Sequence, residues 1–211
     1  MVQQIQDVAY VLKRFFPRRQ KVALLTCSLG RVNVVLKQNA QCVRLWPGML
    51  LTCTLHRKGV LWVADHVSVH AAPIPQTHHN IIWLHHILEL CYYFLPLESP
   101  AADIFFYLKK CCCLIWQCEV LDMQWQAIVK KMCVIKLLSM IGFYGCGDIR
   151  EYLALFQELS DLFIDFTNEQ KVEFLKQRLV LLKTIDMDEW ILSCLKNHPM
   201  FQTFKTVSFN Y

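Results

Sequence analysis

Acidic side chains are almost missing from the first 75 residues of this 211-residue chain. Only Asp7 and Asp65 stand there against ten lysines and arginines, which gives this part a net charge of +8. The remaining residues hold 12 basic and 15 acidic side chains, for a net charge of −3. A basic part followed by a mildly acidic part indicates a polyanion-binding module joined to a module with another task.

Catalytic motifs are also missing. The chain contains no Gly-x-Ser-x-Gly, no P-loop and no His-Glu-x-x-His sequence. The glycine-rich segment Gly142–Gly147 follows an expected helix rather than a strand, which argues against a phosphate-binding loop. The sequence therefore predicts a protein that is not an enzyme and needs no cofactor.

A membrane span and an export signal are not indicated. The best candidate span, Ile81–Leu97, contains His85, His86 and Glu89, is interrupted by Pro96, and is shorter than the roughly 20 residues that a span needs. Glutamines and an aspartate occupy the place of a basic signal-peptide start. The 11 cysteines are odd in number and lie mostly in apolar runs. We therefore expect a reduced, cytoplasmic protein without a membrane partner.

Clusters of potential metal ligands are present but poorly spaced. Adjacent residues of the triplet Cys111–Cys113 would point in different directions on a helix, so together with Cys118 they do not form a tetrahedral set. His79 and His86 could share a helix face but lack a third ligand. The sequence predicts helix packing here and no metal site.

The segment Lys21–Lys37 carries the strongest structural signal. Two alternating apolar runs meet at a tight Ser28-Leu29-Gly30 corner, which is typical of a β-hairpin. We expect one face of this hairpin to enter a core and the other to reach solvent. The predicted inward residues are Val22, Leu24, Thr26, Val32, Val34 and Leu36, and the predicted outward residues are Arg31, Asn33 and Lys37.

Three further strands are predicted around the hairpin, at Val8–Phe16, Gly48–His56 and Val60–Val69. Gly59 lies in the tight turn between the last two, where a positive φ is expected. Five short strands within about 70 residues, separated by turn signals, indicate a small closed or partly open β-barrel.

Everything after Pro73 and Pro75 has helical character. We expect helices from Thr77 to Leu95, from a Ser99-Pro100 start to Gln117, and from Asp122 to Ile141, the last ended by Gly142. Capping-box spacings at 148–151, 167–170 and 186–189 bring the total to about six. The predicted fold class is all-β plus all-α, with a barrel domain at 1–72 and a helical bundle at 76–211.

Three stretches, taken in order, give the chain a family likeness. They are the hairpin with its basic third strand, the segment Arg44–Leu51 followed by a basic-Gly turn and an aromatic strand, and Lys136–Tyr144. Together they resemble the bacterial recombination mediator RecO (recombination protein O). The family's four-Cys zinc module has no counterpart here, since the corresponding segment contains only Cys146.

The resemblance implies an N-terminal OB-fold followed by a helical domain. It further implies a role in DNA repair and recombination: binding of single- and double-stranded DNA, annealing, and recombinase loading with RecR and single-strand-binding protein. The alternatives left open are a non-catalytic adaptor and a membrane-peripheral protein with a basic surface.

Basic side chains and loop aromatics are the residues expected to contact DNA, because phosphates attract cations and bases stack on rings. An ordinary solvated surface is the competing interpretation, and barrel core is the competing place for Phe15 and Trp62. The predicted DNA contacts are Lys13, Arg14, Arg18, Arg19, Lys21, Arg31, Lys37, Arg44, Trp46, Arg57 and Lys58. Lys130, Lys131 and Lys136 are predicted to receive the acidic tail of single-strand-binding protein.

Overall fold

The computed structural model describes residues 4–15, 20–37, 44–73, 77–117, 123–143 and 187–196, together with positions 173, 177, 180 and 198. For residues 114–117 it describes the backbone alone. The predicted DNA contacts Arg18 and Arg19 lie outside the described residues, as do Cys118 and the capping boxes at 148–151 and 167–170.

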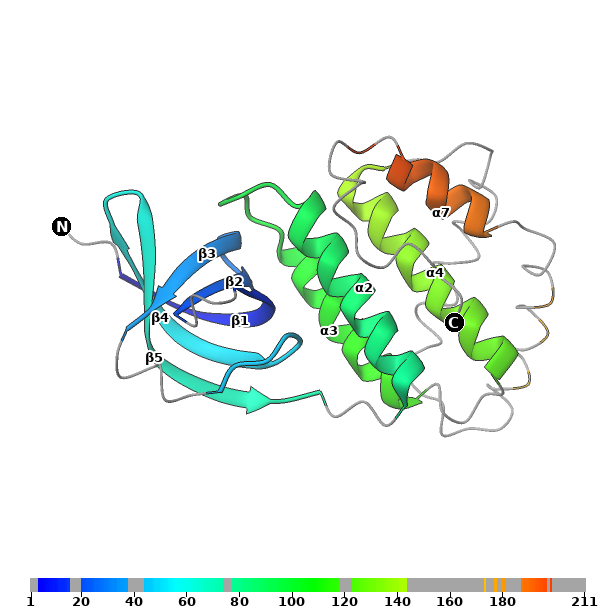
Figure 1. Ribbon diagram of the computed structural model, residues 1–211, viewed down its shortest axis with the longest axis horizontal. Coiled ribbons are helices and arrows are strands. Elements are labelled where there is room, and N and C mark those ends of the chain that lie inside the picture. The colour runs from blue at the N-terminus through cyan, green and yellow to red at the C-terminus, as the bar shows by residue number, and fades with distance from the viewer. Residues whose placement is uncertain are drawn as a thin grey trace. The chain divides into compact units, whose positions relative to one another are not determined.

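Five strands form a sheet that closes on itself (Figure 1), in the order β1-β2-β3-β5-β4. An antiparallel pairing of β1 with β4 completes the ring, and β3 and β5 run parallel. All five predicted strands are confirmed. They are β1 (Gln4–Arg14), β2 (Lys21–Thr26), β3 (Gly30–Leu36), β4 (Leu50–Lys58) and β5 (Leu61–Ala71).

The interior of the closed sheet is built from one side of each strand. Burial alternates along the whole of β3, as period-two side-chain geometry requires. The predicted inward face of the hairpin is confirmed, and the buried Thr26 hydroxyl is satisfied by the Leu29 N–H and the Gly30 carbonyl. The interior cluster contains Ala9, Val11, Val22, Leu24, Val32, Val34, Leu36, Leu45, Leu51, Cys53, Leu55, Trp62 and Ala64.

The outer face of the hairpin differs from the prediction. Arg31 and Asn33 are half-buried rather than solvated, and Ala23 and Leu25 on the neighbouring strand are fully buried. The reason is that helices cover this side of the sheet: the Tyr10 ring of β1 lies 5.4 Å from that of Phe105. Of the three predicted outward residues, only Lys37 is exposed.

Four helices are described, and their ends follow local chemistry. The Thr77 hydroxyl accepts the Asn80 N–H and caps α2, as predicted. Gly142, at φ +92°, ends α4, and the Phe143 N–H returns to the Leu138 carbonyl in a Schellman closure. The helices are α2 (His78–Phe94), α3 (Ala102–Gln117), α4 (Met123–Ile141) and α7 (Met187–Lys196).

The start of α3 corrects the predicted Ser99 cap. The first helical hydrogen bond runs from the Phe105 N–H to the Ala101 carbonyl, so the helix begins after Ala101. Before it, the chain is held along β3, where a Cβ on Gly30 would lie only 1.8 Å from the Ser99 carbonyl oxygen. Glycine at position 30 permits this approach as well as its φ of +69°.

Contacts divide the chain into two compact units. The first contains residues 1–76 together with 84–109, and the second contains 77–83 together with 110–211. The helices α2 and α3 thus each contribute to both units. The domains expected at 1–72 and 76–211 stay a prediction. Among the described helices, none is both long enough and apolar enough to cross a bilayer.

Arg31→Met is expected to lower the free energy of unfolding by about 1.5–3 kcal/mol, the range for a hydrogen bond made by a charged group. Its guanidinium donates to the Tyr92 carbonyl near the end of α2. Urea unfolding would measure the change. The exposed Lys58→Met is the control, with an expected change within about 0.5 kcal/mol. Equal effects of the two substitutions would contradict the structural role given to Arg31.

Candidate nucleic-acid interface

The end of β1 faces aromatic side chains of α2. The Lys13 ammonium lies 4.5 Å from the centre of the Tyr92 ring and 5.1 Å from that of Tyr93. It also donates a hydrogen bond of 3.2 Å to the Tyr93 hydroxyl. From β3, the Arg31 guanidinium lies 5.3 Å from the Tyr92 ring centre. These distances are those of cation–π interactions.

A third cation extends the same arrangement. The Lys21 ammonium lies 4.9 Å from the Phe15 ring centre, and that ring meets the edge of Tyr92 at 6.1 Å. We call Lys13, Phe15, Lys21, Arg31, Tyr92 and Tyr93 the cation–aromatic cluster. In the described part of the chain, no carboxylate forms an ion pair with any of its three cations. The cluster therefore concentrates positive charge beside aromatic rings.

Arg31, half-buried like Lys13 and Lys21, also contacts the backbone of α2. Its guanidinium donates to the carbonyl of Tyr92, one of the last carbonyls of α2, where the helix dipole favours positive charge. Burial lowers the pKa of Arg31, and the charge of Tyr92 opposes that shift. Within the described residues its Nε has no hydrogen-bond partner. Arg31 thus connects β3 to the backbone of α2, whereas Lys13 and Lys21 contact aromatic side chains.

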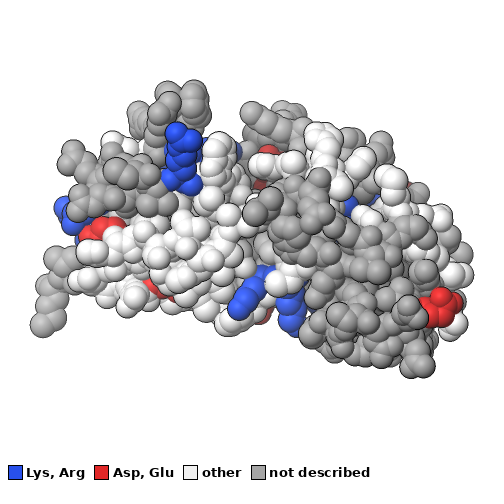
Figure 2. Space-filling view, turned by 90° about the horizontal axis from the view of Figure 1, so that it is seen from below, with Lys and Arg blue, Asp and Glu red and all other residues white. Residues whose placement is uncertain are grey.

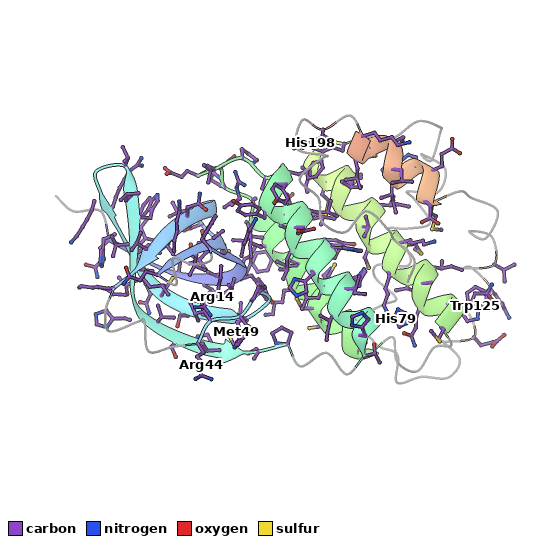
Figure 3. All side chains as sticks on the ribbon, in the orientation of Figure 1. Arg14, Arg44, Met49, His79, Trp125 and His198 are labelled. Carbon is purple, nitrogen blue, oxygen red and sulfur yellow. The ribbon has the colours of Figure 1, made fainter. Side chains whose placement is uncertain are left out.

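The segment before β4 supplies a second, more exposed group. Trp46 is 58% exposed and Arg44 is also exposed. Backbone hydrogen bonds of 2.9 and 2.7 Å join Val11 of β1 to Met49 and Gly48, which places this segment alongside β1. Figure 3 labels Arg44 and Met49 in this segment and Arg14 on β1. Trp46 is therefore accessible for base stacking, as the sequence predicted for a loop tryptophan.

The remaining predicted DNA contacts differ in whether they have an intramolecular partner. Arg57 forms a 3.1 Å ion pair with Glu98 and stacks on Trp62 at 5.6 Å. Lys58 is exposed and Lys37 pairs with Asp65. On the face drawn in Figure 2, the described lysines and arginines stand at separate places rather than in one continuous band. Trp62 is buried inside the closed sheet, which confirms the core interpretation and excludes base stacking on it.

Asp65, on β5, contacts one side chain at the end of β3 and one on β4. Its carboxylate, 8% exposed, accepts from Lys37 at 3.0 Å and lies 3.2 Å from His56 Nε2. Burial raises the pKa of Asp65, but the hydrogen bond from Lys37 and the charges of His56, Lys37 and His66 outweigh it, so that pKa is lowered. Lys37 is therefore held by an internal carboxylate.

The three lysines predicted to bind a partner lie on α4 but not on one exposed surface. Lys130 is only 4% exposed, and its backbone carbonyl accepts from the Trp83 indole at 3.2 Å. Lys131 pairs with Asp188 of α7 at 2.7 Å, and Lys136 is half-buried. The buried Lys130 cannot present its charge to a tail peptide in this arrangement.

The described cysteines are free thiols, and burial strongly perturbs two of them. Cys111 is buried, Cys112 half-buried and Cys113 exposed, so the triplet spreads over the helix as its adjacent positions predict. Burial raises the pKa of Cys53 and of Cys112 to about 12, which keeps both thiols protonated at neutral pH. No group of three or more metal-ligating side chains is found in the part of the chain that the structure describes.

Tyr92 and Tyr93 are the candidate site residues that sequence reasoning missed. They lie in the apolar run Ile81–Leu97, within the helix that the sequence predicts from Thr77 to Leu95. Their only sequence signal is that they are two amphipathic aromatic residues in the last turn of that helix, where the hydroxyl end of each ring can remain in contact with solvent. No family model matches the chain, and no curated protein is significantly similar to it. The likeness to RecO therefore stays a prediction.

The contribution of the Asp65 ion pairs to the free energy of unfolding should decrease in acid. A carboxylate whose pKa is lowered on folding stabilises the protein above its unfolded pKa of about 3.9 and loses that contribution as pH falls through the folded value. Asp65→Asn is expected to be less stable than wild type at pH 7 and to lose less stability between pH 5 and pH 2. Urea unfolding at several pH values measures both, with the exposed Asp103→Asn as control. Parallel pH curves for wild type and Asp65→Asn would contradict this assignment.

Proposed function

We propose that this chain is a non-enzymatic DNA-binding protein of the RecO type, a recombination mediator that binds single- and double-stranded DNA and promotes annealing. In this proposal the closed sheet is an OB-fold that captures the DNA backbone. RecR and single-strand-binding protein are the proposed partners in recombinase loading, carried over from the resemblance.

The cation–aromatic cluster is the observation that carries the proposal. Binding of a single strand needs cations for phosphates and ring faces for bases. Lys13 and Lys21 lie within 5 Å of the rings of Tyr92 and Phe15, and no described carboxylate neutralises them. A strand passing the end of β1 would meet both requirements at once, and it would exchange intramolecular cation–π contacts for phosphate and base contacts.

The strand order supports the OB-fold part of the proposal. A five-stranded Greek-key ring in the order β1-β2-β3-β5-β4 has the connections expected of that fold. In OB-folds the outer face of strands 2 and 3 often binds oligonucleotides. Here Ala23 and Leu25 on that face are buried. The proposed path of DNA is therefore displaced to the rim, along Lys13, Lys21 and the Arg44–Trp46 segment.

A protein-interaction adaptor is the second candidate. It is favoured by the number of barrel cations that have intramolecular partners: Arg31 with Tyr92, Lys37 with Asp65 and Arg57 with Glu98. In that case the positive charge would serve to hold the sheet and helices together, and the protein would bind oligonucleotides no better than an ordinary basic surface does.

The two candidates are separated by titrating a labelled single-stranded oligonucleotide at several salt concentrations. Lys13→Gln with Lys21→Gln is expected to weaken binding and to make the slope of log K against log salt shallower by about 1.4, since each phosphate contact on a single strand contributes about 0.7. Lys109→Gln is the matched control, because Lys109 is exposed on α3 outside the cluster.

Urea unfolding of each variant establishes that it is folded. Binding by the wild type that is lost in the double variant alone supports the proposal. No binding by the wild type at low salt, or a salt slope unchanged in the folded double variant, would leave the adaptor function as the better account.

A further inference from the structure

The turn between β4 and β5 exposes apolar side chains to solvent. Val60 is 85% exposed and Leu61 is 54% exposed. The turn stands clear of the described chain, since a Cβ added to Gly59, at φ +61°, would meet none of its atoms within 4 Å. Two adjacent aliphatic residues at this turn form a small apolar surface that is open to a partner.

A third exposed aliphatic residue lies beside this turn. Leu97, 51% exposed, bridges in parallel to Arg31 on β3. One edge of β3 at Arg31 is occupied by Leu25 of β2, so Leu97 lies on the opposite edge. That is the edge on which β5 pairs, starting with Trp62 opposite Val34. Leu97 therefore lies on the same edge of β3 as the start of β5.

Positive charge borders this apolar group. Lys58 is exposed and has no charged partner in the described residues. The neighbouring Arg57, 45% exposed, pairs with Glu98, which directly follows Leu97. This ion pair ties the β4–β5 turn to the segment before α3. We call Lys58, Val60, Leu61 and Leu97 the apolar tip.

We propose that the apolar tip binds the surface of an anionic lipid bilayer. A convex group of aliphatic side chains fits a deformable apolar layer, whereas nucleic acid offers phosphates and base faces that suit the cation–aromatic cluster instead. Lys58 would lie at the level of the lipid headgroups, where anionic lipid attracts cations. Shallow insertion of three side chains gives reversible, salt-sensitive binding rather than permanent anchoring. The lipid proposal rests on the apolar tip and does not depend on the proposed DNA path, although Leu97 bridges to Arg31 of the cation–aromatic cluster.

The test is cosedimentation of the full-length protein with vesicles of phosphatidylcholine, with and without phosphatidylserine. Binding is expected only with phosphatidylserine and should weaken as salt is raised. Val60→Asp with Leu61→Asp is expected to abolish it, and Lys58→Gln to weaken it about fivefold, the factor that corresponds to about 1 kcal/mol per cation. Phe106→Ser, which removes an exposed apolar ring on α3, is the control and should bind as wild type does.

Urea unfolding midpoints equal to wild type would show that the tip variants are folded, and Lys58→Gln provides a milder change that leaves the aliphatic residues in place. Absence of vesicle binding by the wild type would overturn the proposal. So would equal binding with and without phosphatidylserine, or binding unchanged in the folded Asp variants. Loss of oligonucleotide binding in those variants, without any vesicle binding, would assign the tip to nucleic acid instead.

Discussion

The contact on which the first compact unit depends is the one between Arg31 and the end of α2. The guanidinium donates a hydrogen bond to the Tyr92 carbonyl and lies against the ring of the same residue. It thereby supplies a donor to a helix end that would otherwise lack one, and this half-buried cation has no carboxylate partner among the described residues. Lys13 lies against the ring of the neighbouring Tyr93 and donates to its hydroxyl. Charge and aromatic surface together hold the sheet and helix in one unit.

The strands and their inward faces could be predicted because period-two alternation is a local property. The alternating positions of Val22, Val32 and Val34 in the sequence predict their burial. The outward face could not be predicted in the same way: Arg31 and Asn33 alternate just as solvated residues would. Their burial depends on residues of α2 and α3 that come about 60 positions later, and no local pattern indicates which strand a helix will cover.

The candidate site could likewise be predicted only in part. A surplus of cations in the barrel sequence is a matter of composition, but whether a cation is available depends on distant partners such as Asp65 for Lys37 and Glu98 for Arg57. Two tryptophans illustrate the difference: Trp46 in a loop is exposed, and Trp62 in a strand is enclosed. Tertiary packing alone places Tyr92 and Tyr93 in the candidate site, because tyrosines within an apolar run of sequence indicate a helix core.

The division of α2 and α3 between two compact units determines which fragments of the chain keep the sheet covered. A fragment ending at residue 72 would keep all five strands but lose the helical segment 84–109. Tyr10, Leu12, Ala23 and Leu25 would then form an uncovered aliphatic and aromatic sheet face. Such a face associates with copies of itself, so the isolated ring of strands would aggregate. A fragment that keeps this face of the sheet covered must therefore extend to Lys109, in the first half of α3.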